Sequence, residues 1–157
     1  MIKALFAVDS RNGLGKNGSL PWPRDKEDMN RFRTLTTGHV VVMGSRSWDD
    51  PNMRRPLPNR INVVLTSKHG GNDWADIVAH GVDDVVALER KFTNKTIWMC
   101  GGANVLAQFR GKVEEVYLTR FDGDYGCDTF VDLEPYLKGF EEVCREDGTA
   151  KTFSIWR

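Results

Sequence analysis

The sequence predicts an α/β fold of three layers, αβα: a central mixed, mostly parallel sheet of about eight strands, an antiparallel C-terminal edge and about four helices. Two observations predict it. Short, almost continuous apolar runs, typical of strands buried on both faces, alternate with segments of helical periodicity. The chain also ends in two strand-like segments, residues 140–145 and 151–157, which Asp147 and Gly148 would join as a hairpin. At this length we expect one domain, residues 1–157.

Composition and charge exclude several classes of function. Lys plus Arg and Asp plus Glu are equal at 22, so nothing draws the chain to nucleic acid or to an anionic membrane, and we expect small-molecule partners. No segment approaches the ~20 apolar residues of a membrane span, and the apolar run at residues 2–8 is too short for a signal peptide. Cys100, Cys127 and Cys144 are odd in number and lack metal-ligand spacing. We therefore expect no disulfide framework, no metal, a cytoplasmic location and a monomer.

The first strand is expected at residues 2–8, where an apolar run ends at Asp9. Residues 10–19 follow with three glycines and no periodicity, which predicts a long loop. Loops of this length in compact domains are functional or disordered. The flanking strand and helix favour an active-site flap here.

The next helix carries an acid whose role the spacing leaves open. Pro21 and Pro23 fix φ, so the helix begins after them, with Asp25 as its cap and Asp28 three residues later. Asp28 lies beside an apolar face, one turn before Phe32. It is either a solvated first-turn acid favoured by the helix dipole, or a half-buried acid that binds a cationic or amidine-like ligand.

Two further strands, residues 40–43 and 61–65, are followed by polar segments suited to phosphate. Residues 44–48 turn the chain at the carboxyl end of the first of these strands, where open α/β sheets bind ligands. Arg46 would close on such a phosphate, or is a solvated surface charge. The cluster that begins at Thr66 suits an adenosine phosphate, or is an ordinary turn.

The second half repeats the strand and helix pattern. We expect a brief strand at 77–78, a helix at 82–92, a buried strand at 96–100, a helix at 104–109 and a strand at 113–121. Gly101 and Gly102 lie between the buried strand and the second helix, where the missing Cβ atoms let backbone approach a pyrophosphate. The alternative is that this Gly-Gly pair only forms a tight turn, as such pairs do in many proteins.

Over essentially its whole length the chain resembles the dihydrofolate reductase family. The matching segments are Ala7-Val8-Asp9 with Gly13 to Gly18, Leu20-Pro21-Trp22, Asp28-Met29 with Phe32, Met43-Gly44, Ser47-Trp48, Arg55 to Pro58 with Arg60, Gly101-Gly102, Tyr117-Leu118-Thr119, and Asp128-Thr129-Phe130. The resemblance implies NADPH-dependent reduction of 7,8-dihydrofolate to 5,6,7,8-tetrahydrofolate in one-carbon metabolism. Hydride passes from the nicotinamide C4 to pterin C6, and N5 is protonated. Dihydrofolate is then the substrate, and antifolate inhibitors are further expected ligands.

The resemblance also implies catalytic roles for Asp28, Trp22 and Thr119. Asp28 would bind the pterin 2-amino group and N3, steadied by Thr119, with a protonating water near Trp22. Burial should raise the pKa of Asp28 and favour protonation of the substrate. Glu27 and Asp25 are rival acids, but the family keeps its acid one helical turn before the aromatic residue.

The remaining site residues are also implied by the resemblance. Pterin and nicotinamide would meet Leu5, Ala7 and Cys100; Phe32 and Leu57 would sandwich the substrate's aromatic spacer, and Arg60 would bind the glutamate α-carboxylate. The alternative is that Arg60 is an ordinary surface arginine. Residues 13–19 would be the flap over nicotinamide, paired with Asp128. The implied cofactor contacts are Ala7, Leu14, Gly15, Ser19, Leu20, Gly44, Ser45, Arg46, Ser47, Thr66, Ser67, Lys68, Cys100, Gly101, Gly102, Ala103, Asn104, Val105 and Leu106.

Three positions depart from the family pattern. Leu106 stands where a tyrosine is common beside the nicotinamide, which implies modest turnover. Ser45 stands where a basic residue often meets the adenosine-side phosphate, which weakens the expected preference for NADPH over NADH. Residues 49–53 are more acidic and bulkier than usual on the inhibitor side.

Two other functions remain open. A related NADPH-dependent pyrimidine reductase of riboflavin synthesis would keep the fold, but would not need Arg60 or the pairing of Asp28 with Phe32. A non-catalytic folate- or NADPH-binding structural module would have lost turnover, for which Leu106 and Ser45 are the hints.

Overall fold

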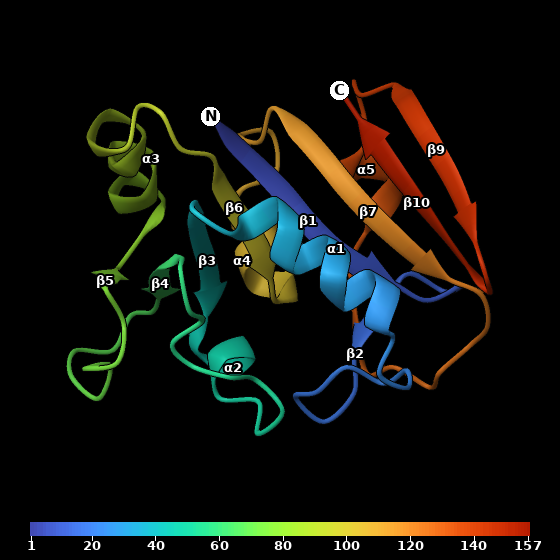
Figure 1. Cartoon of the computed structure of the whole chain (residues 1–157), viewed down its shortest axis with the longest axis horizontal. Helices are drawn as coiled ribbons and strands as arrows, with labels where there is room; N and C mark the ends of the chain where they lie inside the picture. The colour runs from blue at the N-terminus through green and yellow to red at the C-terminus, as the bar shows by residue number, and fades with distance from the viewer.

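The computed structural model describes residues 1–157 and is built on one eight-stranded sheet (Figure 1). Its strand order is β5-β4-β3-β6-β1-β7-β10-β9. The strands are β1 Ile2–Val8, β3 Val40–Gly44, β4 Ile61–Leu65, β5 Ile77–Ala79, β6 Ile97–Gly101, β7 Glu115–Phe121, β9 Glu142–Gly148 and β10 Lys151–Trp156. Pairing is parallel from β5 through β7, and β10 is antiparallel to both neighbours. The mostly parallel sheet with an antiparallel C-terminal edge is confirmed.

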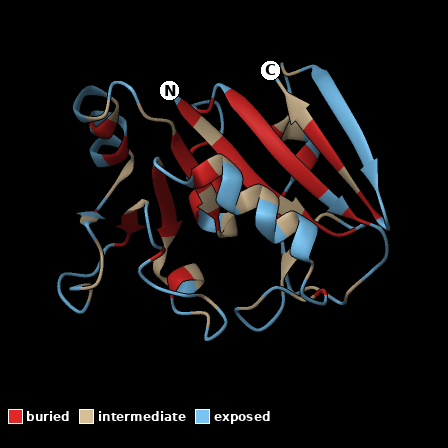
Figure 2. Ribbon diagram, in the orientation of Figure 1, coloured by how far each residue is buried: buried red, intermediate tan, exposed pale blue.

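Helices cover both faces of this sheet, as expected of three layers. One face carries α1 (Lys26–Thr36) and α2 (Ser45–Trp48), which pack on two small clusters that include Leu5, Tyr117 and Val64. The other face carries α3 (Val82–Lys91), α4 (Ala103–Gln108) and α5 (Leu133–Tyr136), packed on the main core of 22 residues. Burial follows these layers, since the central strands are buried and β9 is exposed (Figure 2). None of the helices is long and apolar enough to span a bilayer.

Helix α1 begins where the prolines and the capping acid predict. Asp25 has extended backbone, and its side chain accepts a hydrogen bond from the Asp28 amide at 2.8 Å. The helix ends before Gly38, whose φ of +82° lies in the left-handed region that favours glycine. The cap fixes the helical phase, and therefore the direction of the Asp28 side chain.

The structure differs from the prediction in four places. Asp147 and Gly148 pair with Thr152 and Lys151 as part of β9, so the C-terminal hairpin turns at Thr149 and Ala150 instead. The loop at 10–19 contains a short strand, β2 (Gly13–Gly15), which pairs antiparallel with β8 (Thr129–Phe130). Residues 45–48 form one helical turn where a plain turn was expected, and α5 was not predicted at all. Four residues are too few to show helical periodicity, and the β2–β8 pair joins segments more than a hundred residues apart.

Candidate functional site

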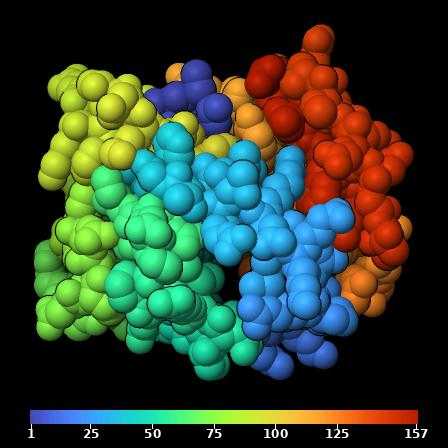
Figure 3. Space-filling view, viewed as in Figure 1, coloured from blue at the N-terminus to red at the C-terminus, as the bar shows by residue number.

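The candidate residues gather on the sheet face beneath α1, at the carboxyl ends of β6, β1 and β7. Ala7 is the register partner of Thr119 across β1 and β7, and Leu5 packs in one cluster with Cys100. Thr119 donates a hydrogen bond of 2.7 Å to Asp28 Oδ1, which joins α1 to the sheet. Figure 3 shows a hollow on this side of the molecule, bordered by α1, the flap segment and the residues that follow β3.

Asp28 is half-buried, so the interpretation as a solvated first-turn acid is wrong. Burial raises the pKa of Asp28, and the nearby charge of Asp25 adds to the rise. The Thr119 hydrogen bond opposes it, as do the charges of Arg31 and Lys151. A carboxyl group in this setting takes up a proton more readily than an exposed aspartate.

The two rival acids are engaged elsewhere. Asp25 is the helix cap and forms an ion pair with Lys151 at 3.1 Å. Glu27 is exposed and lies 3.5 Å from the same lysine. Asp28 is therefore the acid that the helix directs to Thr119 and the row of candidate pterin contacts.

Trp22 is buried beside the loop that follows β7. Its ring stacks on Phe121 with centroids 4.8 Å apart and meets the edge of Tyr125 at 6.1 Å. This packing fixes Trp22, which lies between the flap segment and the Asp25 cap of α1. No direct hydrogen bond joins Trp22 to Asp28.

The candidate contacts for the far end of a substrate lie on one wall. Phe32 and Leu57 pack in the same cluster, and the Leu57 amide donates to Asn62 Oδ1 at 2.7 Å. Arg60 is partly buried, with Nε donating to the Pro58 carbonyl at 2.9 Å and Nη1 to Thr36 Oγ1 at 3.3 Å. Burial lowers the pKa of Arg60, yet an arginine stays charged at neutral pH. Two hydrogen bonds therefore hold the Arg60 guanidinium in place, whereas a surface arginine in solvent would be free to move.

The glycine doublet forms a cradle without side chains. Gly101 has a φ of +134°, and a Cβ added at Gly102 would lie 3.5 Å from Ser47 Oγ. A Cβ at Gly44 would come within 3.1 Å of a Val105 methyl, so α4 packs closely on the end of β3 because Gly44 lacks a side chain. Backbone amides and one hydroxyl are what a pyrophosphate needs at such a cradle.

A second polar group lies beyond β3 and β4. Ser45 Oγ is 3.5 Å from Thr66 Oγ1, which also accepts a hydrogen bond from the Lys68 amide at 3.1 Å. The side chains of Arg46, Ser67 and Lys68 are exposed beside them. Hydroxyls beside two exposed cations suit a terminal phosphate, so the residues present fit a phosphorylated dinucleotide.

The last four residues of the expected cofactor contacts, residues 103–106, differ in how far their side chains are exposed. Ala103 begins α4 and is partly buried, and Asn104 is exposed. The side chains of Val105 and Leu106 are buried in the main core. Leu106 therefore contributes its side chain to core packing rather than to a surface of the hollow.

The flap is tied down at its middle. The Asn17 amide donates to Asp128 Oδ2 at 2.9 Å, and the Asp128 amide donates to the Gly15 carbonyl at 3.0 Å, which confirms the expected pairing of Asp128 with this loop. Ser19 Oγ donates to Asp50 Oδ1 at 2.9 Å. Leu14 packs against the core, whereas Leu20 is exposed.

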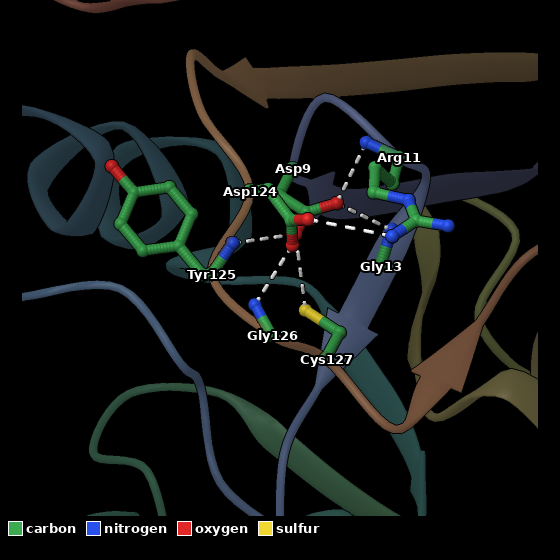
Figure 4. A network of polar contacts seen from close by, with 7 residues as sticks. All are labelled: Asp9, Arg11, Gly13, Asp124, Tyr125, Gly126 and Cys127. Carbon is green, nitrogen blue, oxygen red and sulfur yellow. Dashed lines mark hydrogen bonds and ion pairs between the residues drawn. The ribbon is translucent and has the colours of Figure 1, made fainter.

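The start of the flap is held by Asp9, which the sequence did not single out (Figure 4). Its fully buried carboxylate accepts from the amides of Gly13 at 2.8 Å, Arg11 at 2.9 Å and Tyr125 at 3.1 Å, and from the Cys127 thiol at 3.4 Å. Burial acts to raise the pKa of Asp9, but these hydrogen bonds outweigh it and leave the pKa below its usual value. The one sequence signal is an aspartate at a strand end, followed by a glycine-rich loop.

Known proteins of one family resemble this chain in sequence and in fold. The family model described as dihydrofolate reductase matches residues 1–154. The dihydrofolate reductase of Mycobacterium tuberculosis (strain H37Rv) is 40% identical over 108 residues, which cover 68% of this chain and 63% of that protein. The Sus scrofa enzyme is 31% identical over 153 residues, with 86% and 82% covered.

A solved structure, described as dihydrofolate reductase from Enterococcus faecalis complexed with NADP(H) and RAB-propyl, superposes with a TM-score of 0.89. It is 26% identical, and the match covers 100% of this chain and 95% of that one. The family model, the relatives and the fold agree, and the chain belongs to the dihydrofolate reductase family.

Proposed function

We propose that this chain is an NADPH-dependent oxidoreductase that reduces 7,8-dihydrofolate to 5,6,7,8-tetrahydrofolate. The observation that carries the proposal is the half-buried Asp28 carboxyl, held by Thr119 over the row formed by Leu5, Ala7 and Cys100. We further propose that residues 1–157 act as one domain and as a monomer in the cytoplasm. Three unpaired cysteines and a site made within one chain support this part.

Asp28 binds and orients the pterin in this proposal. Its two oxygens accept from the 2-amino group and from N3, and the Thr119 hydroxyl keeps one of them directed at the ring. Its raised pKa makes a proton available at the pterin edge, which favours protonation at N5. Trp22, packed on Phe121, closes the flap side of the site against bulk water.

The cofactor is assigned to the glycine cradle and the polar group beyond β4. NADPH supplies the hydride that pterin C6 receives. Ser47 and the backbone at Gly101 and Gly102 would hold the pyrophosphate, and Arg46 with Thr66 and its neighbours would hold the 2′-phosphate. Leu14 and the flap that follows it would cover the nicotinamide.

The tail of the substrate is assigned to the wall formed by Phe32, Leu57 and Arg60. Phe32 and Leu57 would pack on the aromatic spacer, and the fixed guanidinium of Arg60 would bind the glutamate α-carboxylate. The same wall would take antifolate inhibitors. Neither the guanidinium nor the Asp28 pairing is needed to reduce a riboflavin precursor, so this wall favours folate as the substrate class.

Loss of NADPH absorbance on addition of dihydrofolate tests the proposal directly. We expect the wild-type chain to consume both, and Asp28→Asn to turn over about 10²-fold more slowly or worse at neutral pH. Part of the rate should return at acid pH, where solvent protonates the substrate. An Asp28→Asn enzyme as fast as wild type at neutral pH would overturn the assignment of the acid. NADPH consumption with the pyrimidine substrate alone would indicate the riboflavin-type reductase, and NADPH binding without consumption would indicate a structural module.

A further inference from the structure

A lysine is buried beneath the first turn of α1. Lys151 begins β10, and its side chain is only 5% exposed. Its Nζ lies 3.1 Å from Asp25 Oδ2 and 3.5 Å from Glu27 Oε1, so two acids of α1's start share one cation. Buried lysines are rare unless paired, and this pairing joins the C-terminal hairpin to the helix that carries Asp28.

Asp25 connects the lysine to the backbone of the catalytic acid. Asp25 Oδ1 accepts from the Asp28 amide at 2.8 Å while its Oδ2 faces Lys151. The Asp28 side chain is held separately by Thr119 of β7. Thr119 is the register partner of Phe153, two residues from Lys151 on β10. Backbone and side chain of Asp28 are therefore fixed by two neighbouring strands.

The hairpin is shaped for this contact. Gly148 ends β9, and a Cβ there would come within 3.2 Å of both Glu27 Oε1 and Lys151 Cγ. Ala150, between the two strands, has a φ of +56°, which marks a tight connection directly before the lysine. The turn thus delivers Lys151 to the helix start with little freedom.

We infer that Lys151 is a positioning residue for Asp28: through Asp25 it fixes the first turn of α1, and its charge balances the carboxylate of Asp25 beside the catalytic acid. The inference rests on the proposed function for the identity of the acid. It adds a residue from the last strand of the chain, outside the hollow, to the machinery that sets the protonation of that acid.

The charges that face Asp28 come from three elements. On α1, Asp25 raises the pKa of Asp28 and Arg31 lowers it; from β10, Lys151 lowers it; from β7, the Thr119 hydrogen bond lowers it. Arg31 lies 4.5 Å above the Phe153 ring, and its Nη1 is buried without a hydrogen-bond partner.

Further groups surround these: Glu27 on α1 contacts Lys151, while Glu146 of β9, Tyr117 of β7 and Cys144 of β9 act on Arg31. Removal of the lysine charge leaves the repulsion from Asp25 unbalanced. Removal of the Asp25 charge leaves two cations near Asp28 and no such repulsion. The two changes therefore push the protonation of Asp28 in opposite directions.

The test compares Lys151→Met, Lys151→Arg and Asp25→Asn. Asparagine caps helices as well as aspartate does, so Asp25→Asn removes the charge and keeps the cap. The first readout is the carboxyl titration of Asp28 by carbon-13 NMR in the protein without ligand. We expect Lys151→Met to raise the Asp28 pKa by about half to one unit, Asp25→Asn to lower it by a similar amount, and Lys151→Arg to leave it near wild type.

The second readout is the pH profile of single-turnover NADPH oxidation with dihydrofolate. The acid limb should move with the NMR titration in each variant, and the plateau should fall in Lys151→Met because the first turn of α1 is loosened. The same Asp28 titration in all three variants would overturn the inference, even with a lower plateau. Failure of the proposed function is distinguishable, because the wild-type chain would then oxidise no NADPH while the NMR titrations still answer the question. If Lys151→Met does not fold, Asp25→Asn alone decides, since an unshifted or raised Asp28 pKa contradicts the inference.

Discussion

Replacement of Asp9 by asparagine removes the charge and one of the two acceptor oxygens that hold the start of the flap. An asparagine offers one acceptor oxygen, so it serves either Gly13 and Arg11 or Tyr125, and its amide group then faces an N–H that has lost its partner. The site is fully buried, so water does not replace what is lost. One or two charge-assisted hydrogen bonds at about 1.5–3 kcal/mol each give a loss of about 1.5–6 kcal/mol in the free energy of unfolding.

Asp124→Asn is the matched control for Asp9→Asn. Asp124 pairs with Arg11 at 3.4 Å in the same loop pair, but both side chains are at least half exposed. Exposed ion pairs contribute about 0–1 kcal/mol, so Asp124→Asn should stay close to wild type. Urea denaturation followed by tryptophan fluorescence measures both variants. Equal unfolding free energies for the two variants would refute the reasoning that burial makes the Asp9 hydrogen bonds contribute more to stability than the exposed Asp124 ion pair.

The Asp9 interaction also has a pH signature. The folded pKa of Asp9 lies below its unfolded value near 3.8, so its contribution to stability is fully present above that value and is lost as the pH falls through the folded pKa. The difference in unfolding free energy between wild type and Asp9→Asn should therefore be constant near neutral pH and shrink in acid. A gap that persists below the folded pKa would mean that packing, not charge, holds the flap.

The remaining predictions concern the proposed chemistry. Thr119→Val removes the hydroxyl that stabilises ionised Asp28, so the Asp28 pKa and the pH midpoint of hydride transfer should both rise, while Thr119→Ser should leave both near wild type; an unchanged midpoint in Thr119→Val contradicts the assignment. Arg60→Leu should raise KM for dihydrofolate about 10- to 100-fold with little change in KM for NADPH, because only the substrate tail loses a charged partner. Dihydropteroate, which lacks the glutamate, is the control substrate and should show the same KM with Arg60→Leu as with wild type.

Much of the fold follows from local patterns in the sequence. The apolar runs of β1, β3, β4 and β6 and the alternating pattern of β7 need no long-range information, and Pro23 with Asp25 places the start of α1. The family resemblance supplied the pairing of Asp28 with Thr119, because the two residues are 91 positions apart and no periodicity connects them.

The contacts that sequence reasoning missed are long-range and polar. Asp9 meets Tyr125 and Cys127 across more than a hundred residues, and Lys151 meets Asp25 across a similar span. A buried lysine and an exposed lysine have the same local sequence signature, since burial depends on which strand pairs with which. Register, rather than composition, decides these contacts.

Two aspartates in this chain show how the number of donors separates an anchor from a reacting acid. Asp9 is closed to solvent, and four donors keep its pKa low, so it stays ionised and serves as a fixed point for the flap. The Asp28 side chain has one hydroxyl donor, so burial dominates and its pKa rises. Environments that push the pKa values of two carboxyl groups in opposite directions give one group a structural role and the other a chemical role. A further donor to the Asp28 side chain would therefore tighten its position but reduce its readiness to take up a proton. Positioning through the backbone, by Asp25 and Lys151, holds Asp28 without adding that donor.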